Sequence, residues 1–469
     1  METSRALLND LAHRVEAEYS ARTPKSAALY ENATDVMPGG DTRTVTYFEP
    51  HPLFIESGKG CCLIDVDNNE YLDFMNNYSA LIHGHAHPAI VEAVSQQLRK
   101  GTCFASPIEL QTRLAQILCT RLPGVERIRF CNSGTEATLI AIRTAKAFTG
   151  RNKILKMEGG YHGSHDLAQI SVKPRLIEAG PANAPNAVPD TPGLFRGVIS
   201  DVLVAPFNDI AATSKIIDLN RDDLAAVIVE PVLGSPGLIP AQPPFLRFLR
   251  EACQSCGAIL IFDEVVTFRL AFGGAQELYH VTPDLTTLGK IIGGGFPVGA
   301  FGGRADIMEL LNPRKGKLSH SGTFNGNAIT MAAGLACLEL LTADEIQRIN
   351  QLGDTLKGLL AAALASASVP GQITGTGSLI NVHFTDRKVI DYRTSALSET
   401  TDILRLLHLS LLNQGIFIAP RGEFCISTPM TQKEIESAAE AFRSALDLAS
   451  TYFDSLVTSN RHRSLVQRS

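Results

Sequence analysis

Hydrophobic positions in the middle of the chain alternate between short apolar runs and longer segments with helical spacing. The clearest example is the apolar run 225–232, the helical segment 243–257 and a second apolar run, 258–265. The apolar side chains of the helical segment have the spacing of one buried helical face; they are Phe245, Leu249, Ala252, Cys253 and Cys256. We expect Gly257 to end this helix. The pattern indicates βαβ units and a mainly parallel sheet between about residues 110 and 305.

The first part of the chain has a different pattern. Residues 1–45 have helical spacing that leads into a Pro-Gly-Gly turn at 38–40, and 53–74 has the alternation of short strands. We expect those strands to turn at Gly58 and at the Asp-Asn-Asn sequence 67–69. The beginning of the chain thus predicts a helix followed by a small antiparallel sheet.

After about residue 330 helical and strand patterns are mixed again. The expected helices cover 327–341, 398–413 and 431–453, and the expected strand covers 378–384. A second, smaller domain therefore follows the large one.

The composition is that of an ordinary globular protein, with 45% hydrophobic and 19% charged residues in a chain of 469. A net charge of −6 and an isoelectric point near 6.1 give no broad basic field, so we expect no nucleic-acid partner. No stretch is long and apolar enough to span a bilayer, and the amino-terminal residues lack the apolar core of a signal peptide. The nine scattered cysteines do not form a disulfide framework. We therefore expect a cytoplasmic protein without a membrane partner.

The segment CNSGTEA, residues 131–137, predicts a helix start that can bind an anion. Ser133 and Glu136 have the spacing of a capping box, and Gly134 allows a ligand to approach the backbone. The free amide groups of such a helix end suit a phosphate ester, with the hydroxyl groups of Ser133 and Thr135 as further donors. An ordinary capped helix is the alternative, and on this segment alone it is the better interpretation.

Asp263 stands near the end of a strand so apolar that its carboxylate must be buried. A buried aspartate is unfavourable by several kcal/mol unless it is paired, so it requires a cation or a hydrogen-bond donor. A protonated pyridine nitrogen would satisfy it, and so would a structural salt bridge.

Lys290 lies between an apolar, strand-like stretch and a glycine-rich loop. Free lysine has a pKa of about 10.4 and is a poor nucleophile at neutral pH, but desolvation or covalent attachment to a cofactor removes that difficulty. The glycines that follow leave room for a ligand. They lack the strand-turn-helix context of a nucleotide-binding loop, so that interpretation is rejected.

Together these segments resemble the class III aminotransferases, which have fold type I and use pyridoxal 5′-phosphate (PLP). The matching motifs are NSGTEA (132–137), GGYHG (159–163), VEPV (229–232), DEVVT (263–267), DLTTLGKIIGGGFPVGAFGGR (284–304) and SHSGTFNGN (319–327). The resemblance extends from about Pro38 to Pro429. It implies an α/β fold with a large PLP-binding domain over 76–330 and a small α/β domain built from 1–75 and 331–469.

The resemblance also implies roles for the matching residues. Lys290 would hold the cofactor covalently and move the proton during catalysis, and Asp263 would pair with the pyridine nitrogen. Tyr161 would stack on the cofactor ring with Val265 against the other face, and His162 would support Tyr161.

Three further expectations concern the phosphate, the substrate and the oligomer. Residues 133–135 would hold the phosphate, and Glu230 would lie behind the substrate face. Thr323 would reach the phosphate of a partner subunit, which implies a homodimer.

Two arginines are candidates for a substrate carboxylate, because a guanidinium group can grip it with two charge-assisted hydrogen bonds. Arg43 follows the Pro-Gly-Gly turn, and Arg421 lies in IAPRGEF; both match carboxylate-binding positions in similar enzymes. Surface ion pairs are the alternative for both. Arg269 could instead serve the structure.

Two other patterns suggest metal or redox chemistry, and both have simpler interpretations. His83, His85 and His87 alternate like metal ligands, but no further ligand cluster completes a site, so we expect no metal. Cys253 and Cys256 share the buried face of the predicted helix and are expected in the core.

The leading hypothesis is an aminotransferase that moves an amino group from a β-amino acid, or a similar carboxylate-bearing amine, to a 2-oxo acid. The stretch DEVVTFRLAFGGAQ and the opening PGGDTRTV resemble the β-amino-acid branch more than the glutamate-1-semialdehyde aminomutases. A 1,2-aminomutase is the alternative within PLP chemistry. The loop over about 163–200 is expected to cover the site and to decide between the two. A non-catalytic PLP-binding regulator would lack the lysine or carry a helix-turn-helix extension, and this chain does neither.

Overall fold

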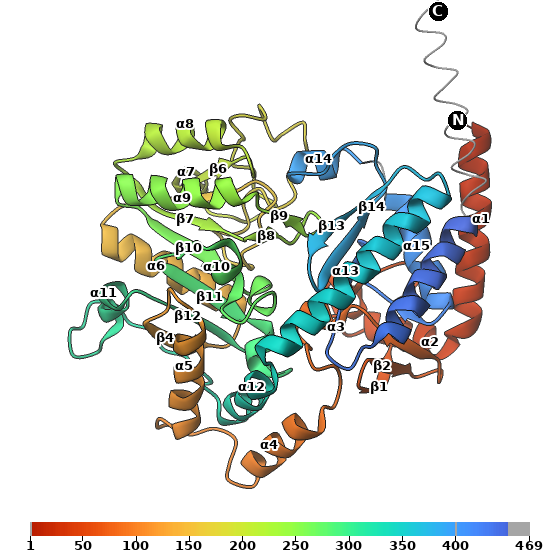
Figure 1. The fold of residues 1–469 in the computed structure, drawn as a ribbon, viewed down its shortest axis with the longest axis horizontal. Coiled ribbons are helices and arrows are strands. Elements are labelled where there is room, and N and C mark those ends of the chain that lie inside the picture. The colour runs from red at the N-terminus through yellow and green to blue at the C-terminus, as the bar shows by residue number, and fades with distance from the viewer. Residues whose placement is uncertain (1, 399–400, 449–469) are drawn as a thin grey trace, which may run out of the picture.

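The computed structural model describes residues 2–398 and 401–448 and contains a seven-stranded sheet (Figure 1). In spatial order its strands are β4 (Arg127–Cys131), β12 (Gly299–Gly303), β11 (Leu285–Gly289), β10 (Ile259–Asp263), β7 (Leu224–Val229), β5 (Lys153–Met157) and β6 (Val202–Ala205). The neighbours from β11 to β6 pair in parallel, and β12 runs antiparallel to both β11 and β4. The expected mainly parallel sheet is confirmed.

The core of this part has two layers because side chains of the central strands alternate between the faces of the sheet. In β7, Ala226 and Ile228 join a cluster with the helix after β4, whereas Val227 and Val229 join a cluster with the helix before β10. A strand buried on both faces is continuously apolar, as β7 is.

Helices cover both faces of the sheet. Those of the large part are α4 (Pro88–Leu98), α5 (Glu109–Arg121), α6 (Gly134–Thr149), α7 (Arg196–Asp201), α8 (Ile210–Asn220), α9 (Pro243–Cys256), α10 (Gly274–Tyr279), α11 (Ala305–Met308) and α12 (Ala328–Leu340). Short 3-10 turns are η3 (Thr267–Arg269), η4 (Lys290–Gly293) and η5 (Glu309–Leu311). The predicted unit β7–α9–β10 is confirmed, and Gly257 ends α9 with a left-handed φ of 72°. Cys253 and Cys256 lie in the core.

The other strands of the described residues form two smaller sheets and a short hairpin. The first contains β1 (Ile55–Lys59), β2 (Cys62–Asp65), β3 (Glu70–Asp73) and β15 (Ile416–Phe417). The second contains β13 (Gln372–Thr376), β14 (Leu379–His383) and β16 (Glu423–Cys425), and the hairpin is β8 (Val232–Leu233) with β9 (Ile239–Pro240). Because β15 pairs in parallel with β3, segments from both ends of the chain form one sheet.

Helices from both ends also lie together in this smaller part. They are α1 (Glu2–Arg22), α2 (Pro24–Thr34), α3 (Asn76–Ser79), α13 (Ala343–Ser366), α14 (Tyr392–Ala396), α15 (Thr401–Asn413) and a helix over 432–448, with 3-10 turns η1 (Pro38–Gly40) and η2 (Thr44–Thr46). Figure 1 shows α1 beside α15, and α13 leading from α12 toward the smaller sheets. The boundaries 1–75, 76–330 and 331–469 stay a prediction.

The structure corrects three details of the expected elements. The single amino-terminal helix is two helices, because Pro24 has no amide hydrogen and begins a new one. Gly58 lies inside β1, and the chain turns instead at Gly60, whose φ is 59°. The predicted helix 431–453 begins one residue later and is helical over 432–448, and residues 449–453 lie outside the described residues.

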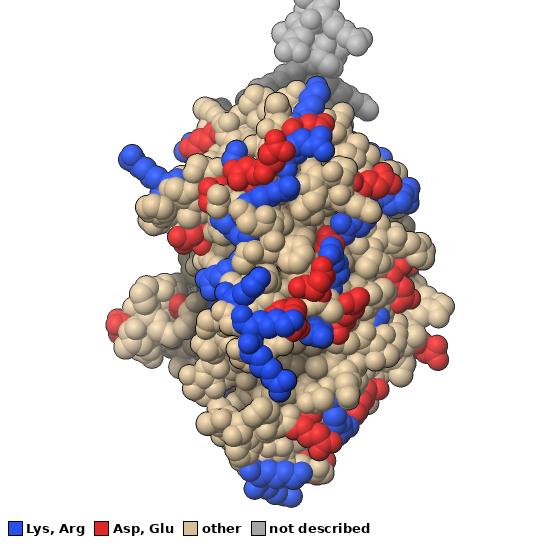
Figure 2. All heavy atoms as spheres, turned by 90° about the vertical axis from the view of Figure 1, so that its left-hand side faces the viewer, with Lys and Arg blue, Asp and Glu red and all other residues tan. Residues whose placement is uncertain are grey.

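The surface and the helices add two observations on partners. Figure 2 shows basic and acidic side chains interspersed on one face of the molecule, without a broad basic field there. Among the described residues, no helix has the length and hydrophobicity needed to cross a bilayer.

Candidate active site

A cavity of about 550 Å³ lies where five strands of the large sheet end. It brings together ten of the residues singled out in the sequence: Arg43, Ser133, Gly134, Thr135, Tyr161, His162, Glu230, Asp263, Val265 and Lys290. All except Arg43 lie at or just after the carboxyl ends of β4, β5, β7, β10 and β11. Ligand sites of open α/β sheets form at this edge.

The amino terminus of α6 opens onto the cavity. Ser133 Oγ accepts a hydrogen bond from the Glu136 amide at 3.1 Å, so Ser133 is the N-cap, as expected. The Glu136 carboxylate accepts from the amide of Asn132 at 2.8 Å and not from that of Ser133, so the expected reciprocal capping box is displaced by one residue. The helix start retains unpaired amides and a positive dipole end, which suit an anion.

Gly134 lies close to Val265, which favours a residue without a side chain at this position. A Cβ atom at position 134 would lie 3.2 Å from Val265 Cγ2, so a side chain there would press on the cavity wall. Thr135 Oγ1 accepts a hydrogen bond from the Ser164 amide at 3.2 Å, which ties the segment after Tyr161 to the helix start.

Asp263, at the end of β10, is 4% exposed. Its Oδ2 lies 2.8 Å from His162 Nδ1, and its Oδ1 accepts from Thr287 Oγ1 at 3.0 Å and from the Val265 amide at 3.2 Å. Burial lowers the pKa of His162, although Asp263 opposes that shift. A neutral His162 with its proton on Nδ1 then donates to the Asp263 carboxylate and holds it in place.

Lys290 follows β11 directly and has a φ of 49°, which is unusual for a residue with a side chain. Its Nζ donates to Ser79 Oγ at 3.4 Å. Burial lowers the pKa of Lys290, opposed by the carboxylates of Glu423 and Glu230. A lowered pKa increases the neutral, nucleophilic fraction of an amine.

Glu230 follows β7 and supports the backbone beneath Tyr161. Its carboxyl oxygens accept from the Tyr161 amide at 2.8 Å and from the Gly234 amide at 3.2 Å. Burial, reinforced by the nearby charge of Asp263, raises the pKa of Glu230 to about 8. Tyr161 is 47% exposed and lines the cavity.

The two candidate substrate arginines have different surroundings. Arg43 lines the cavity and donates to Asn77 Oδ1 at 2.7 Å. Arg421 is absent from the described lining and donates through Nε to Glu423 Oε2 at 2.8 Å. Arg269 is fully buried and donates to Ser378 Oγ and to the carbonyl oxygens of Ser79 and Ile426, which is a structural position.

Thr323 lies outside the described cavity lining of its own chain. The imidazoles of the histidine run each have their own partner. His83 pairs with Thr428 Oγ1 and the Cys337 carbonyl, His85 pairs with Asp73, and His87 accepts from the amide of Ala89 at the start of α4; the ring distances are 2.9, 2.9, 2.7 and 3.3 Å, respectively.

Sequence reasoning missed several residues that shape the site. Asn77 holds Arg43 and has a φ of 49° in a distorted turn, a feature without a sequence signal. Thr287 could have been found, because parallel pairing of β10 with β11 places it opposite Asp263. Glu423, the partner of Arg421, could not be identified from spacing alone.

These features fit a phosphorylated pyridine cofactor. The α6 terminus and the Ser133 hydroxyl suit its phosphate, and the Asp263 carboxylate has acceptor capacity left for a ring N–H. Lys290 Nζ has only one hydrogen-bond partner among the described residues. A helix start that suits a phosphate, a buried carboxylate and a lysine amine thus occur together in one cavity.

Comparisons with known proteins agree with this chemistry. The family model for "Aminotransferase class-III" matches residues 45–446. Glutamate-1-semialdehyde 2,1-aminomutase of Methanothermobacter thermautotrophicus is 41% identical over 425 residues, which is 90% of this chain and 99% of that protein.

Solved structures of transaminases share the fold. An omega-transaminase from Sphaerobacter thermophilus is 47% identical with a TM-score of 0.88 and coverage of 90% of this chain and 97% of that one. A beta-phenylalanine aminotransferase from Variovorax paradoxus is 38% identical with a TM-score of 0.86 and coverage of 95% and 98%. The chain belongs to the class III aminotransferase family of enzymes, whose cofactor is pyridoxal 5′-phosphate.

Proposed function

We propose that this enzyme transfers an amino group from a β-amino acid, or a similar amine carrying a carboxylate, to a 2-oxo acid. The observation that carries the proposal is the position of Arg43, which shares the cavity with Lys290 while Arg421 is held by Glu423. A carboxylate bound at Arg43 places the substrate amine toward Lys290.

A second cavity supports a substrate with an apolar substituent. It has a volume of about 620 Å³ and shares Arg43 and Asn77 with the first cavity. Its wall includes the apolar side chains of Phe48, Leu53, Phe54, Leu63, Met75 and Phe417. A carboxylate on Arg43 would therefore be flanked by an apolar chamber, which favours binding of a bulky side chain.

The residues of the site have different roles in the proposed reaction. Lys290 would hold the cofactor and move the proton at the substrate carbon, and Asp263 would accept the hydrogen bond of the pyridine N–H. When bound, PLP supplies the electron sink that stabilises negative charge at that carbon. Tyr161 and Val265 would hold the ring between them, and Glu230 fixes the backbone of Tyr161.

Ser133, Gly134 and Thr135 at the start of α6 would hold the phosphate. We further propose a homodimer in which Thr323 completes the phosphate site of the partner subunit. Its exclusion from the cavity of its own chain supports this arrangement. The expected cytoplasmic setting is supported by nine cysteines that are all free.

An aminomutase is the second candidate. It is favoured by the names of the curated relatives at 39–42% identity. The transaminase structures at 47% and 38% identity favour transfer. The two reactions differ in whether a second substrate is needed, because a mutase returns the amino group to the same molecule.

The experiment that separates the candidates is steady-state turnover with and without 2-oxoglutarate. A β-amino acid such as 3-amino-3-phenylpropanoate should be consumed only when the oxo acid is present, with glutamate formed in equal amount. Turnover of glutamate-1-semialdehyde without an oxo acid, together with no consumption of the β-amino acid, would replace the proposal by the mutase.

A further inference from the structure

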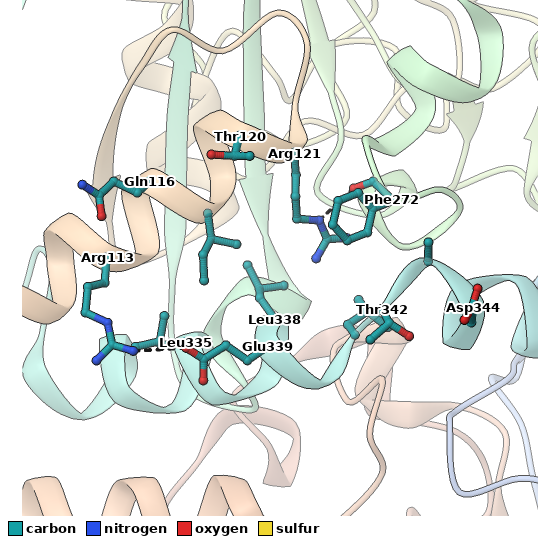
Figure 3. A pocket seen from close by; sticks show the side chains of 13 residues that line it. Arg113, Gln116, Thr120, Arg121, Phe272, Leu335, Leu338, Glu339, Thr342 and Asp344 are labelled. Carbon is teal, nitrogen blue, oxygen red and sulfur yellow. Dashed lines mark hydrogen bonds and ion pairs between the residues drawn. The ribbon is translucent and has the colours of Figure 1, made fainter.

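A cavity of about 770 Å³ lies between α5, α12 and the start of α13 (Figure 3). Its described lining shares no residue with that of the active-site cavity. Arg121 belongs to this lining, but its two terminal nitrogens are buried beside the rings of Phe268 and Phe272. Arg113 and Glu339, also on the lining, pair with each other at 3.2 Å. Neither arginine thus presents an unpaired guanidinium group to this space.

A buried ion pair near the active site joins the smaller part of the molecule to the large one. Arg393 belongs to α14, which lies between the two parts in Figure 1. Its Nε donates to Glu158 Oε2 at 2.8 Å and its Nη2 donates to Glu158 Oε1 at 2.9 Å. The two side chains are 16% and 3% exposed. A pair with two parallel hydrogen bonds fixes the orientation of both groups.

The same guanidinium group also holds the segment 170–190. Its Nη1 donates to the Gly180 carbonyl and its Nη2 to the Ala179 carbonyl, both at 2.8 Å. The hydroxyl group of the neighbouring Tyr392 donates to the Pro174 carbonyl at 2.7 Å. Two adjacent residues of α14 therefore anchor this segment at two places.

Glu158 begins the turn that carries Tyr161. This turn, residues 158–163, contains three glycines, and Gly159 and Gly163 have φ values of 85° and 99°. Glycine gives a chain little stiffness of its own. Contacts from outside the turn must therefore fix its conformation.

The first half of the turn is fixed from α14. Arg393 holds the Glu158 side chain, and the Gly159 amide donates to the Ser171 carbonyl at 2.8 Å, within the segment that α14 anchors. A Cβ atom at position 159 would lie 2.7 Å from Tyr392 Cβ, so the turn also packs directly on α14. Loss of the ion pair would leave the beginning of this glycine-rich turn with fewer contacts.

We propose that Arg393 is a positioning residue for the cofactor, which acts by setting the turn that carries Tyr161. The proposal rests on the expected stacking of Tyr161 on the cofactor ring, and it is independent of which amine is the substrate. Lys290 would hold the aldehyde form of the cofactor covalently, but noncovalent contacts alone hold the aminated form. Arg393 therefore matters most for keeping the aminated form bound between the two halves of a transfer cycle.

Equilibrium dialysis of the full chain against pyridoxamine 5′-phosphate tests the proposal, after any resident cofactor has been removed. The variants are Arg393→Met, Tyr161→Leu and the combination of the two. The matched control is Arg387→Met, which removes an exposed arginine from the same connection between β14 and α14. Inorganic phosphate is the comparison ligand, because it suits the start of α6 and has no ring for Tyr161 to contact.

Tyr161→Leu should raise the dissociation constant of pyridoxamine 5′-phosphate about tenfold, as loss of an aromatic stack does. Arg393→Met should raise it about three- to tenfold, and the combined variant should stay within about twofold of Tyr161→Leu, because both changes act on one contact. Arg387→Met should match the wild type, and every variant should bind inorganic phosphate within about twofold of the wild type.

Arg393→Met leaves the buried Glu158 carboxylate without its cation, which can prevent folding. In that case Glu158→Gln is combined with Arg393→Met, which removes both charges and should give the same rise in the dissociation constant.

Three results would overturn the proposal. They are an unchanged affinity for pyridoxamine 5′-phosphate when Arg393 is replaced, independent effects of Arg393→Met and Tyr161→Leu in the combined variant, and a parallel loss of phosphate binding in Arg393→Met. None of them bears on which amine is the donor, which is measured by turnover.

Discussion

His162 Nδ1 and Asp263 Oδ2 are 2.8 Å apart, and their side chains are 1% and 5% exposed. Thr287 holds the other carboxylate oxygen at 3.0 Å, so Asp263 is fixed from two sides. The carboxylate therefore has a set orientation before a cofactor binds. We expect this pairing, and not a direct contact with substrate, to be the main contribution of His162.

Replacement of His162 by Phe should weaken cofactor binding. The change removes the donor to Asp263 Oδ2, so the carboxylate loses one of the contacts that fix its orientation toward a ring N–H. A lost hydrogen bond to a charged group is worth roughly 1.5–3 kcal/mol, so the dissociation constant of PLP should rise about ten- to a hundredfold. Equilibrium dialysis measures it. The exposed His280→Gln is the control, and an unchanged constant in His162→Phe would show that the pairing is dispensable.

Arg43→Gln should raise KM for a β-amino acid with little change in kcat, because the carboxylate loses its partner in ground state and transition state alike. We expect a rise of about tenfold or more. Arg421→Gln should instead lower stability, since it removes the cation that is hydrogen-bonded to the buried Glu423 carboxylate. Steady-state kinetics of both variants tests which arginine binds the substrate carboxylate. A larger increase in KM from Arg421→Gln than from Arg43→Gln would place the carboxylate at Arg421.

The raised pKa of Glu230 predicts a pH dependence. Because that pKa is about 8 in the folded chain, the carboxyl is neutral below that pH and ionised above it. The unfolded group ionises near about 4.3, so the stability that the neutral form contributes is lost as pH rises from there toward 8 and is constant above.

Ionised Glu230 would repel an anionic substrate, so kcat/KM should fall through an apparent pKa of about 8. A pH profile of the Glu230→Gln variant should lack this limb. Persistence of the same inflection in the variant would assign it to another group.

Arg269→Met should destabilise the fold. The substitution leaves the carbonyl oxygens of Ser79 and Ile426 without their donor, at about 1–3 kcal/mol for each buried group. Urea unfolding measures the loss, and Arg247→Met, at an exposed position of α9, should stay within about 0.5 kcal/mol of the wild type. Equal stability of both variants would contradict the structural assignment of Arg269.

The sequence predicted what local patterns determine. Strands such as β7 are continuously apolar because both faces are buried, and Gly257 ends α9 because a left-handed residue is needed there. The long helix α13 was not anticipated. Two glycines interrupt its pattern, and Gly353 is needed because a Cβ there would lie 2.1 Å from the Gly377 carbonyl oxygen.

Local sequence patterns did not predict the contacts between segments that are distant in the sequence. The contact of Thr287 with Asp263 follows from strand register, and that of Arg43 with Asn77 depends on how both ends of the chain pack. The sequence therefore identified the residues within the motifs, but the residues that surround them could be found only in the folded structure.

The most direct test of the proposed reaction is the absorbance spectrum of the holoenzyme after addition of one amine without any oxo acid. A β-amino acid should convert the bound cofactor to its aminated form and discharge the original band, and an α-amino acid with the same side chain should do so more slowly. If the band persists with both compounds while the protein retains PLP, the β-amino-acid assignment is wrong.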